Sequence, residues 1–355
     1  MIALAYVAAF VTPDALRRVL TWSRAEQGVA RMFLSWLVRP ILVGAAAYWL
    51  ADYAHGLDSW DEETRTWLLR TKNIVARIDL AAIAAAGLIW AFSPLCLVLL
   101  RSEKDGKPRT TLLGYGNALG STFLLLITVV YALLFLLAQP TGQVTLTLCY
   151  LALVVAAELG DQERDSRVLK RAKNISGPPV LPPATPTLVE IACVALGGYV
   201  TFFATGHQAV FAAIQWRTAF VGFATVVYPF SPVFVVLNAL GPLVILPAFG
   251  VALLTVWNNV PTRGTNNTPV APMYTAAALL RASAGFLVYQ TLVTLSSAIF
   301  AAHFRRHLML FKIWAPRYML SGLALLAADI TLILAIGAVS HVAAKTQRVL
   351  GSVFG

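Results

Sequence analysis

The sequence predicts an all-α polytopic membrane protein, built as a bundle of about ten transmembrane helices. Two features of its composition lead to this fold class: 59% of the 355 residues are hydrophobic, and only 12% are charged. That charged share is about half of what a soluble globular domain carries. A third feature is the recurrence of apolar runs of about 20 residues, each long enough to cross a hydrocarbon core about 30 Å thick.

The expected helices follow these apolar runs in chain order. They lie at residues 1–12, 32–54, 78–100, 111–138, 143–159, 187–204, 209–229, 232–256, 273–300 and 318–340. The first run is about half as long as a spanning helix, which is typical of a chain that begins inside a helix of a longer protein; an interfacial helix is the alternative. Prolines between 229 and 247 can kink the helices around them or make one re-entrant.

The runs divide the chain into two halves. Residues 1–159 form a first five-helix membrane segment, whose first helix is truncated, and residues 187–345 form a second one. Between them lies a cytoplasmic, basic and Pro-rich linker at 160–186, which includes the stretch "SGPPVLPPATP". Its prolines favour a stiff, extended backbone. Residues 346–355 form a tail.

The basic residues predict the orientation in the membrane. With ten spans, seventeen Lys and Arg residues fall on one side, in the segments 13–31, 101–110, 160–186 and 301–317, and seven fall on the other side. The positive-inside rule makes the first side cytoplasmic. The net charge of +11 therefore reflects orientation, and no nucleic-acid partner is expected. The sequon Asn266-Asn267-Thr268 then lies on the non-cytoplasmic side.

The stretch "TFFATGHQAVFAAIQWRTAFVG", residues 201–222, places polar groups where a predicted helix ends on the non-cytoplasmic side. Gly206 can break the helix there. Gln208 and Gln215 are two helical turns apart, so they share one face of the next predicted helix. Together with His207 and Arg217 they can bond phosphate or sugar hydroxyl groups. These five residues either bind such a group as substrate or join packed helices by hydrogen bonds, and the residue pattern alone leaves both open.

Two charges lie deep inside predicted spans. Arg281 is about eight residues from the end of its span and Asp329 about eleven residues from either end of the last one, so their depths agree within about 5 Å. Charges at such depth nearly always pair or face the interior of the bundle. The sequence therefore predicts a structural ion pair between Arg281 and Asp329, with a role in contacting substrate as the alternative.

Motifs for catalysis and metal binding are missing from the sequence. It has no GxGxxG, Walker or HExxH pattern, and no cluster of Cys and His. The three cysteines lie within apolar runs and are expected to act as small hydrophobic residues. No polar segment exceeds about 30 residues, which leaves no room for a folded catalytic domain outside the membrane. No catalytic residue, metal ligand or cofactor is therefore assigned to this chain.

Two motifs resemble those of a known family. "TGHQ" followed by "IQW", and then "RRHLMLFKIWAPRYM" before the last helix, are similar to the C-terminal transmembrane region of the GPI ethanolamine phosphate transferases, closest to the PIG-O type, the third-mannose enzyme. The resemblance extends over roughly residues 110 to 345.

The resemblance implies a multi-pass protein of the endoplasmic reticulum membrane that acts in GPI-anchor biosynthesis. In that family a luminal alkaline-phosphatase-like domain, with zinc and a threonine nucleophile, transfers ethanolamine phosphate from phosphatidylethanolamine to a GPI mannose. That domain is absent from this chain, so the resemblance leaves open whether the chain is an enzyme by itself. It also implies phosphatidylethanolamine and a GPI glycolipid precursor as lipid partners, and a small stabilising membrane subunit of the PIG-F type.

Three functions follow from these observations. The first is the membrane portion of an ethanolamine phosphate transferase, which holds the lipid or glycan substrate for the luminal domain. The second is a non-enzymatic membrane subunit or lipid-binding scaffold of the GPI pathway. The third is a multi-span transporter with Arg281 and Asp329 in its path; that class favours an internal repeat with paired broken helices, and the Pro-rich helices of the second half have no counterpart in the first.

Overall fold

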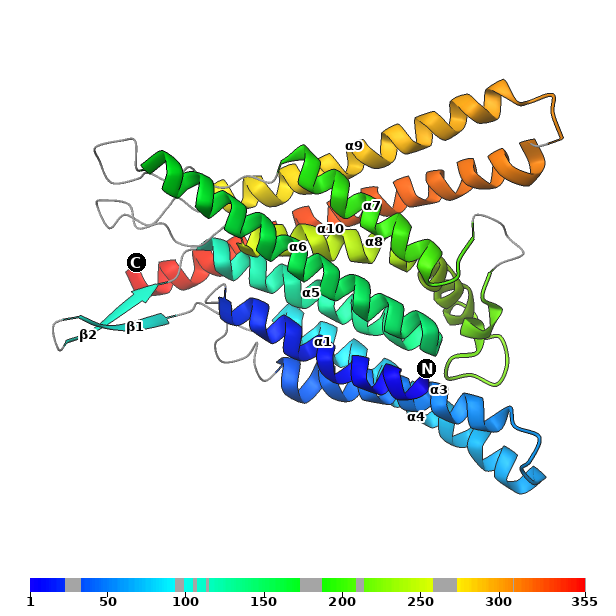
Figure 1. Ribbon diagram of the computed structural model, residues 1–355. Helices are drawn as coiled ribbons and strands as arrows, with labels where there is room; N and C mark the ends of the chain where they lie inside the picture. The colour runs from blue at the N-terminus through cyan, green and yellow to red at the C-terminus, as the bar shows by residue number, and fades with distance from the viewer. Residues whose placement is uncertain are drawn as a thin grey trace.

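The computed structural model describes the chain except for residues 23–32, 93–98, 105–106, 113–114, 173–186, 209–213, 258–272, 309 and 355. In the described part, nine long helices pack side by side into one bundle (Figure 1). Six of them are long and apolar enough to cross a membrane, and two shorter apolar helices accompany them. The predicted fold class, an all-α polytopic membrane protein, is confirmed.

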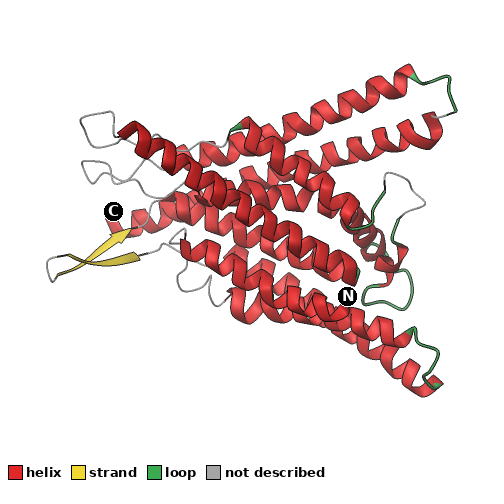
Figure 2. Cartoon of the chain, viewed as in Figure 1, coloured by secondary structure: helices red, strands yellow, loops and turns green. Residues whose placement is uncertain are grey.

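The long helices and the short elements that join them follow one another along the chain. The helices are α1 (Ile2–Trp22), α3 (Arg39–His55), α4 (Glu62–Phe92), α5 (Tyr115–Leu137), α6 (Pro140–Ala172), α7 (Leu188–Ala204), α8 (Phe230–Trp257), α9 (Met273–His303) and α10 (Ala315–Phe354). Short π-helical turns, η1 (Phe33–Val38) and η4 (Leu310–Trp314), precede α3 and α10. Two antiparallel strands, β1 (Leu99–Lys104) and β2 (Lys107–Leu112), connect α4 to α5 (Figure 2).

The most central helix is α8. It packs against α5, α6, α7, α9 and α10, and every residue from 241 to 250 is buried. Its sequence is apolar on all sides, as expected of a helix surrounded by other helices. The contacts of α8 with α5 and α6 join the two predicted halves of the chain into one core.

The helix expected at 209–229 is wrong for the described residues 214–229. These form the short 3₁₀ helix η3 (Trp216–Phe220) and a series of turns before α8 begins. Gly222 has a φ of +79°, a left-handed conformation that breaks helical continuity. Residues 209–213 of this expectation lie outside the described residues. The described part of this apolar run, residues 214–229, therefore lies as a loop at one end of the bundle (Figure 1).

Several predicted boundaries also differ from the structure. The helix expected at 78–100 begins earlier, at Glu62, and ends at Phe92, and Leu99 and Leu100 belong to β1. The first helix does not end at residue 12 but continues through Pro13 to Trp22. Just before the proline, the Thr12 hydroxyl donates to the Ala8 carbonyl (2.9 Å). The helix α6 reaches Ala172, so the first part of the predicted linker is helical, and residues 173–186 of that linker lie outside the described residues. The predicted tail is helical as far as Phe354.

The helix count determines which segments meet at each end of the bundle. At one end lie the N-terminus, the α3–α4 turn, the connection between α7 and α8, and the α9–α10 turn; we name this the cap end (Figure 1). We call that connection the loop 205–229, of which the structure describes only residues 205–208 and 214–229. At the other end lie the β1–β2 hairpin and the C-terminus; we name this the β-hairpin end. The basic connection 303–317 was expected opposite His207, but it lies at the same end, because one expected span between them is a loop.

The charge asymmetry survives this correction. When each segment is assigned by the helix ends that flank it, sixteen Lys and Arg residues count toward the β-hairpin end and nine toward the cap end, with Arg39 and Arg281 left inside helices. Four of the sixteen, Arg24, Arg31, Lys173 and Arg263, lie outside the described residues. The positive-inside rule therefore still predicts that the loop 205–229 lies on the non-cytoplasmic side. The sequon at Asn266 lies outside the described residues; the end of α8 before it and the start of α9 after it both lie at the β-hairpin end.

We expect the sequon at Asn266 to remain unglycosylated when the chain is inserted into microsomes, since α8 ends and α9 begins at the β-hairpin end, which the positive-inside rule predicts to be cytoplasmic. Glu62→Asn creates a sequon with Thr64 in the exposed first turn of α4, at the cap end, and this variant should gain a glycan. An endoglycosidase-sensitive shift on a gel measures both. A shift of the natural chain that Asn266→Gln abolishes would restore the ten-span orientation.

Candidate functional site

The residues Thr205 to His207 form the C-terminal stop of α7. The Gly206 amide donates to the Phe203 carbonyl (3.0 Å), and the His207 amide donates to the Phe202 carbonyl (3.2 Å). Gly206 has a φ of +86°. This pair of bonds around a left-handed glycine is a Schellman motif, which satisfies carbonyl groups that the helix end leaves free. The expectation that Gly206 breaks the helix is confirmed.

His207 is buried under this stop, with 5% of its surface exposed. Its ring stacks on Phe202, the centroids 5.4 Å apart, which supplies the apolar contact that usually accompanies a Schellman motif. Its Nδ1 lies 2.9 Å from the Thr205 hydroxyl, which itself donates to the Thr201 carbonyl (2.9 Å). The hydroxyl proton is thus in use, so Nδ1–H donates to Thr205 and Nε2 keeps its lone pair. Nε2 is buried and has no partner in the described structure.

Burial lowers the pKa of His207 to about 4, because the charged imidazolium loses its hydration. The unfolded chain binds this proton near pH 6.5 and the folded chain only near pH 4. Stability should therefore fall on acidification between these two values, by up to about 1.4 kcal/mol per pH unit. Thermal unfolding of the natural chain and of His207→Gln between pH 4.5 and 7 checks this. The natural chain should show the steeper loss; equal slopes would contradict a neutral, buried His207.

Gln215 connects the loop to α8. Its Nε2 donates to the Thr205 carbonyl (3.2 Å), and its Oε1 accepts from Asn238 Nδ2 (3.1 Å). Asn238 is 2% exposed, and its Oδ1 has no partner among the described residues. Gln215 thus bridges the end of α7 to α8, as the alternative of hydrogen bonds between packed helices expects. The predicted helical face shared by Gln208 and Gln215 is not present, because Gln215 lies at the start of η3.

Two further contacts hold the second half of the loop. The Ser231 hydroxyl, in α8, donates to the Ala219 carbonyl (2.6 Å) and accepts from the Val227 amide (3.0 Å). Arg77, in α4, donates through Nε to the Gly222 carbonyl (2.8 Å) and lies over the ring of Phe223. Backbone groups of the loop thus form hydrogen bonds with side chains of neighbouring helices. In a helix the same backbone groups would bond to one another.

The five predicted substrate residues separate into two groups. Gly206, His207 and Gln215 build the helix stop and its connection to α8. Of these, His207 is buried and Gln215 is partly buried. Gln208 is exposed beside them. Arg217, with 77% of its side chain exposed, does not join the His207 cluster but lies 3.9 Å from Asp52 on α3.

Arg217 borders a pocket of about 550 Å³ between α3, α4 and the loop 214–229. Asp52 and Lys72 both line this pocket and form an ion pair with each other, Oδ1 to Nζ at 2.6 Å; 19% of the Asp52 side chain and 13% of the Lys72 side chain are exposed. Neither residue is among those predicted from the sequence to form a site. A charged residue near the end of an apolar run, such as Asp52, is a feature that could have marked a site. Nothing in the sequence, however, pairs Asp52 with a lysine twenty residues away.

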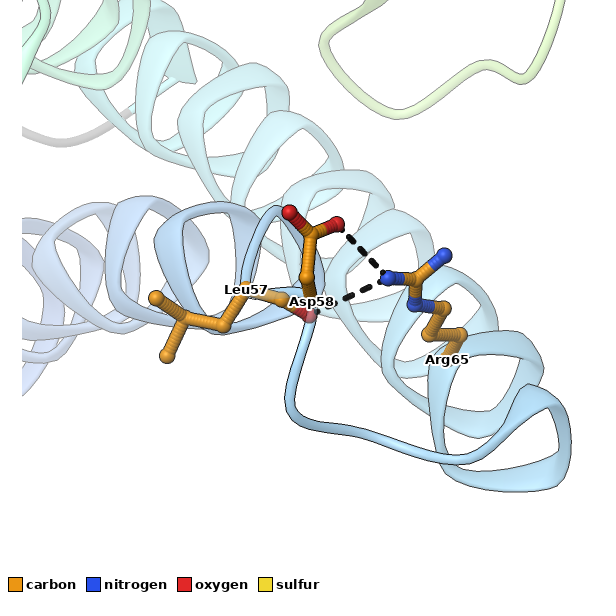
Figure 3. Close-up of polar contacts among 3 residues, drawn as sticks. All are labelled: Leu57, Asp58 and Arg65. Atoms are coloured by element: carbon orange, nitrogen blue, oxygen red, sulfur yellow. Dashed lines mark hydrogen bonds and ion pairs between the residues drawn. The ribbon is translucent and has the colours of Figure 1, made fainter.

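The rim of this pocket is held by the α3–α4 turn. Arg65 Nη2 donates to the Leu57 carbonyl (3.4 Å) and to Asp58 Oδ1 (3.0 Å), which ties the first turns of α4 to the end of α3 (Figure 3). Leu57 also lines the pocket. The charges of this turn, which the sequence analysis used for orientation alone, therefore also shape the pocket wall.

Arg281 and Asp329 lie on the neighbouring helices α9 and α10. Arg281 is exposed and Asp329 is partly buried. No ion pair joins them among the contacts of the described residues. The structure thus brings their helices together without the contact itself, and the pairing stays a prediction.

No group of three or more His, Cys, Asp or Glu side chains that could hold a metal ion occurs among the described residues. The ligands that zinc needs in proteins are side chains of these types, gathered around one point. The described residues do not fit a zinc centre, and no step is assigned to zinc in this chain.

The chain is similar to curated proteins named GPI ethanolamine phosphate transferase 3. It shares 32% identity with the one from Eremothecium gossypii, over 91% of this chain and 29% of the relative. The one from Saccharomyces cerevisiae is 28% identical over 100% of this chain and 32% of the relative. The catalytic subunit from Homo sapiens is 25% identical over 88% of this chain and 34% of the relative.

These similarities confirm the resemblance to GPI ethanolamine phosphate transferases of the PIG-O type. The chain spans about a third of the length of the curated relatives it matches. No protein-family model matches the chain. No solved structure matches it.

Proposed function

We propose that this chain is the membrane portion of a GPI ethanolamine phosphate transferase and holds a lipid or glycan substrate for a luminal alkaline-phosphatase-like domain that is absent from it. One observation carries the proposal: the similarity covers 91% of this chain but only 29% of a relative named for that activity. The chain then corresponds to one part of such a protein, and the apolar helices make that part a membrane part.

The cap end supports a role in holding substrate. The loop 205–229 is tied to α7, α8 and α4 by side-chain hydrogen bonds, so its exposed groups have defined positions. Among the predicted site residues, Gln208 and Arg217 are exposed and free to meet a ligand at the surface. We assign direct contact with substrate to these two, and the positioning of the loop to Gly206, His207 and Gln215.

The proposal includes the location and partners that the resemblance implies. A protein of the GPI-anchor pathway with this role would lie in the endoplasmic reticulum membrane, with the cap end toward the lumen. Phosphatidylethanolamine and a GPI glycolipid precursor would be its lipid partners. A stabilising membrane subunit of the PIG-F type would be its protein partner. Zinc would belong to the luminal domain of the complete enzyme.

The test uses a complete transferase that contains this membrane portion. Gln208→Ala combined with Arg217→Gln should lower ethanolamine phosphate transfer about tenfold, the worth of one or two charge-assisted hydrogen bonds. Protein abundance should stay normal, because both side chains are exposed. Arg305→Gln removes the same charge from the exposed α9–α10 turn at the same end and serves as the matched control. Unchanged transfer at normal abundance in the double variant would rule out this role.

His207→Ala separates positioning from contact in the same assay. Because His207 is buried in the helix stop, this variant should lower abundance or thermal stability together with transfer. A His207→Ala protein with normal stability but no transfer would instead place His207 in direct contact with the substrate.

A further inference from the structure

The pocket between α3, α4 and the loop has the size of a small-ligand site. Its volume of about 550 Å³ falls within the range of about 300–1,000 Å³ typical of such sites. Its floor includes Trp49, whose indole N–H donates to the Leu136 carbonyl (2.9 Å). That donor is therefore already used, so the ring offers the pocket an apolar surface. Phe220 and Phe223 of the loop line the same space.

Exposed aromatic side chains mark the depth of the pocket in the membrane. Tyr53, next to Asp52, is 61% exposed, and Trp216, next to Arg217, is 62% exposed. Trp67 on α4 and Tyr228 at the end of the loop are 62% and 81% exposed. Tyr and Trp collect at the membrane–water interface, where their rings sit at the level of lipid headgroups. Asp52 and Arg217 are sequence neighbours of two of these aromatic residues, so we expect the pocket to lie at that level.

The charges of the pocket leave one cation in excess. Asp52 and Lys72 neutralise each other at 2.6 Å. Arg217 approaches the second Asp52 oxygen only at 3.9 Å, beyond normal hydrogen-bond length, and is 77% exposed. Its guanidinium therefore keeps most of its donors for a ligand. A guanidinium fork matches the oxygens of a phosphate group, and one excess positive charge matches the single negative charge of a phosphodiester.

We propose that this pocket binds the phosphodiester headgroup of a glycerophospholipid. Arg217 bonds the phosphate oxygens, and the Asp52–Lys72 pair forms the polar wall beside it. The aromatic and aliphatic floor accepts the glycerol and the first carbons of the acyl chains. The inference rests on the proposed function in one respect: it takes the cap end as the place where lipid is held. The binding itself is measured without any transfer reaction.

The test is photo-crosslinking of the purified chain in detergent. The probe is a phosphatidylcholine with a diazirine on its headgroup, and mass spectrometry locates the crosslinks. We expect them in the peptides around residues 48–57 and 217–224, which line the pocket. Arg217→Gln should lower their yield about tenfold, and Arg305→Gln should leave it unchanged. A melting temperature equal to that of the natural chain shows that Arg217→Gln is folded.

Competition with unlabelled lipids identifies the recognised group. Phosphatidylethanolamine and phosphatidylinositol, which share the phosphodiester, should both displace the probe, and diacylglycerol should not. Preference for phosphatidylinositol would identify the phosphate of a glycolipid as the source. Equal displacement by diacylglycerol, or crosslinks that Arg217→Gln does not change, would overturn the inference. Binding as expected, without any loss of transfer in the complete enzyme variants, would keep this site and remove the proposed function.

Discussion

Gly198→Ala is expected to destabilise the bundle by about 1–3 kcal/mol, the usual cost of overpacking a close contact. Gly198 lies where α7 crosses α8. A Cβ atom there would stand 2.5 Å from Pro247 Cγ and 2.9 Å from the Leu243 carbonyl oxygen. A proline ring inside a helix and a backbone oxygen cannot move aside as the end of a flexible side chain can. Small residues at such crossings let the helix backbones approach.

The neighbouring glycine supplies the control for this prediction. At Gly197 a Cβ would meet only Leu153 Cδ2, at an ordinary 3.9 Å. Gly197→Ala adds the same methyl group to the same helix, one residue away, so helix propensity changes equally in both variants. Thermal unfolding in detergent should show a lower midpoint for Gly198→Ala alone. Equal midpoints for the two variants would mean that the α7–α8 contact is looser than the structure shows.

Gly44→Ala is expected to destabilise the contact between α3 and α4, and Asp79→Ala to reverse most of the loss. A Cβ at Gly44 would stand 2.3 Å from Asp79 Oδ1 and 2.7 Å from its Cγ. Asp79 is 5% exposed, and its Oδ2 has no hydrogen-bond partner among the described residues. Removing a buried carboxyl group that has no hydrogen-bond partner lowers the free energy of unfolding little or raises it. The reason is that such a group loses its hydration on folding and gains no hydrogen bond in return.

A double-mutant cycle measures this coupling directly. Gly44→Ala alone should lose about 1–3 kcal/mol through overpacking, and the double variant should regain most of it. Gly87→Ala, on α4, is the control, because a Cβ there meets nothing within 4 Å. It should stabilise by up to about 1 kcal/mol through helix propensity alone. Simply additive losses at positions 44 and 79 would show that the two groups do not compete for the same space.

The candidate site could be predicted in part. A glycine before a polar pair at the end of an apolar run indicated the helix stop at Gly206, and the structure confirms it. The sequence could not show that His207 turns inward onto Phe202 while Gln208 stays exposed. Two adjacent side chains after a left-handed residue point to different sides, and the packing partner decides which one is buried. Asp52 and Lys72 could not be paired from sequence, since their contact depends on how α3 and α4 lie together.

The prediction of a helix at 209–229 was wrong for the described residues 214–229 for a related reason. Hydropathy measures the transfer of side chains into an apolar surrounding, and it does not record how the backbone satisfies its hydrogen bonds. In this loop Ser231, Gln215 and Arg77 supply those bonds from side chains, so an apolar run stays non-helical at the end of the bundle. Because this loop replaces a predicted span, the α9–α10 turn lies at the cap end, where the sequence predicted the opposite end.

The sequence by itself determined that this chain is an all-α membrane protein, because long apolar runs with few charges are stable only when each backbone group bonds within a helix. It also determined the family resemblance, which rests on short motifs, and the position of the helix stop. The tertiary structure alone decided that residues 214–229 form no spanning helix, the end of the bundle at which the α9–α10 turn lies, and the assembly of the Asp52, Lys72 and Arg217 pocket. These depend on contacts between residues far apart in the chain, which local patterns of hydropathy and charge do not contain.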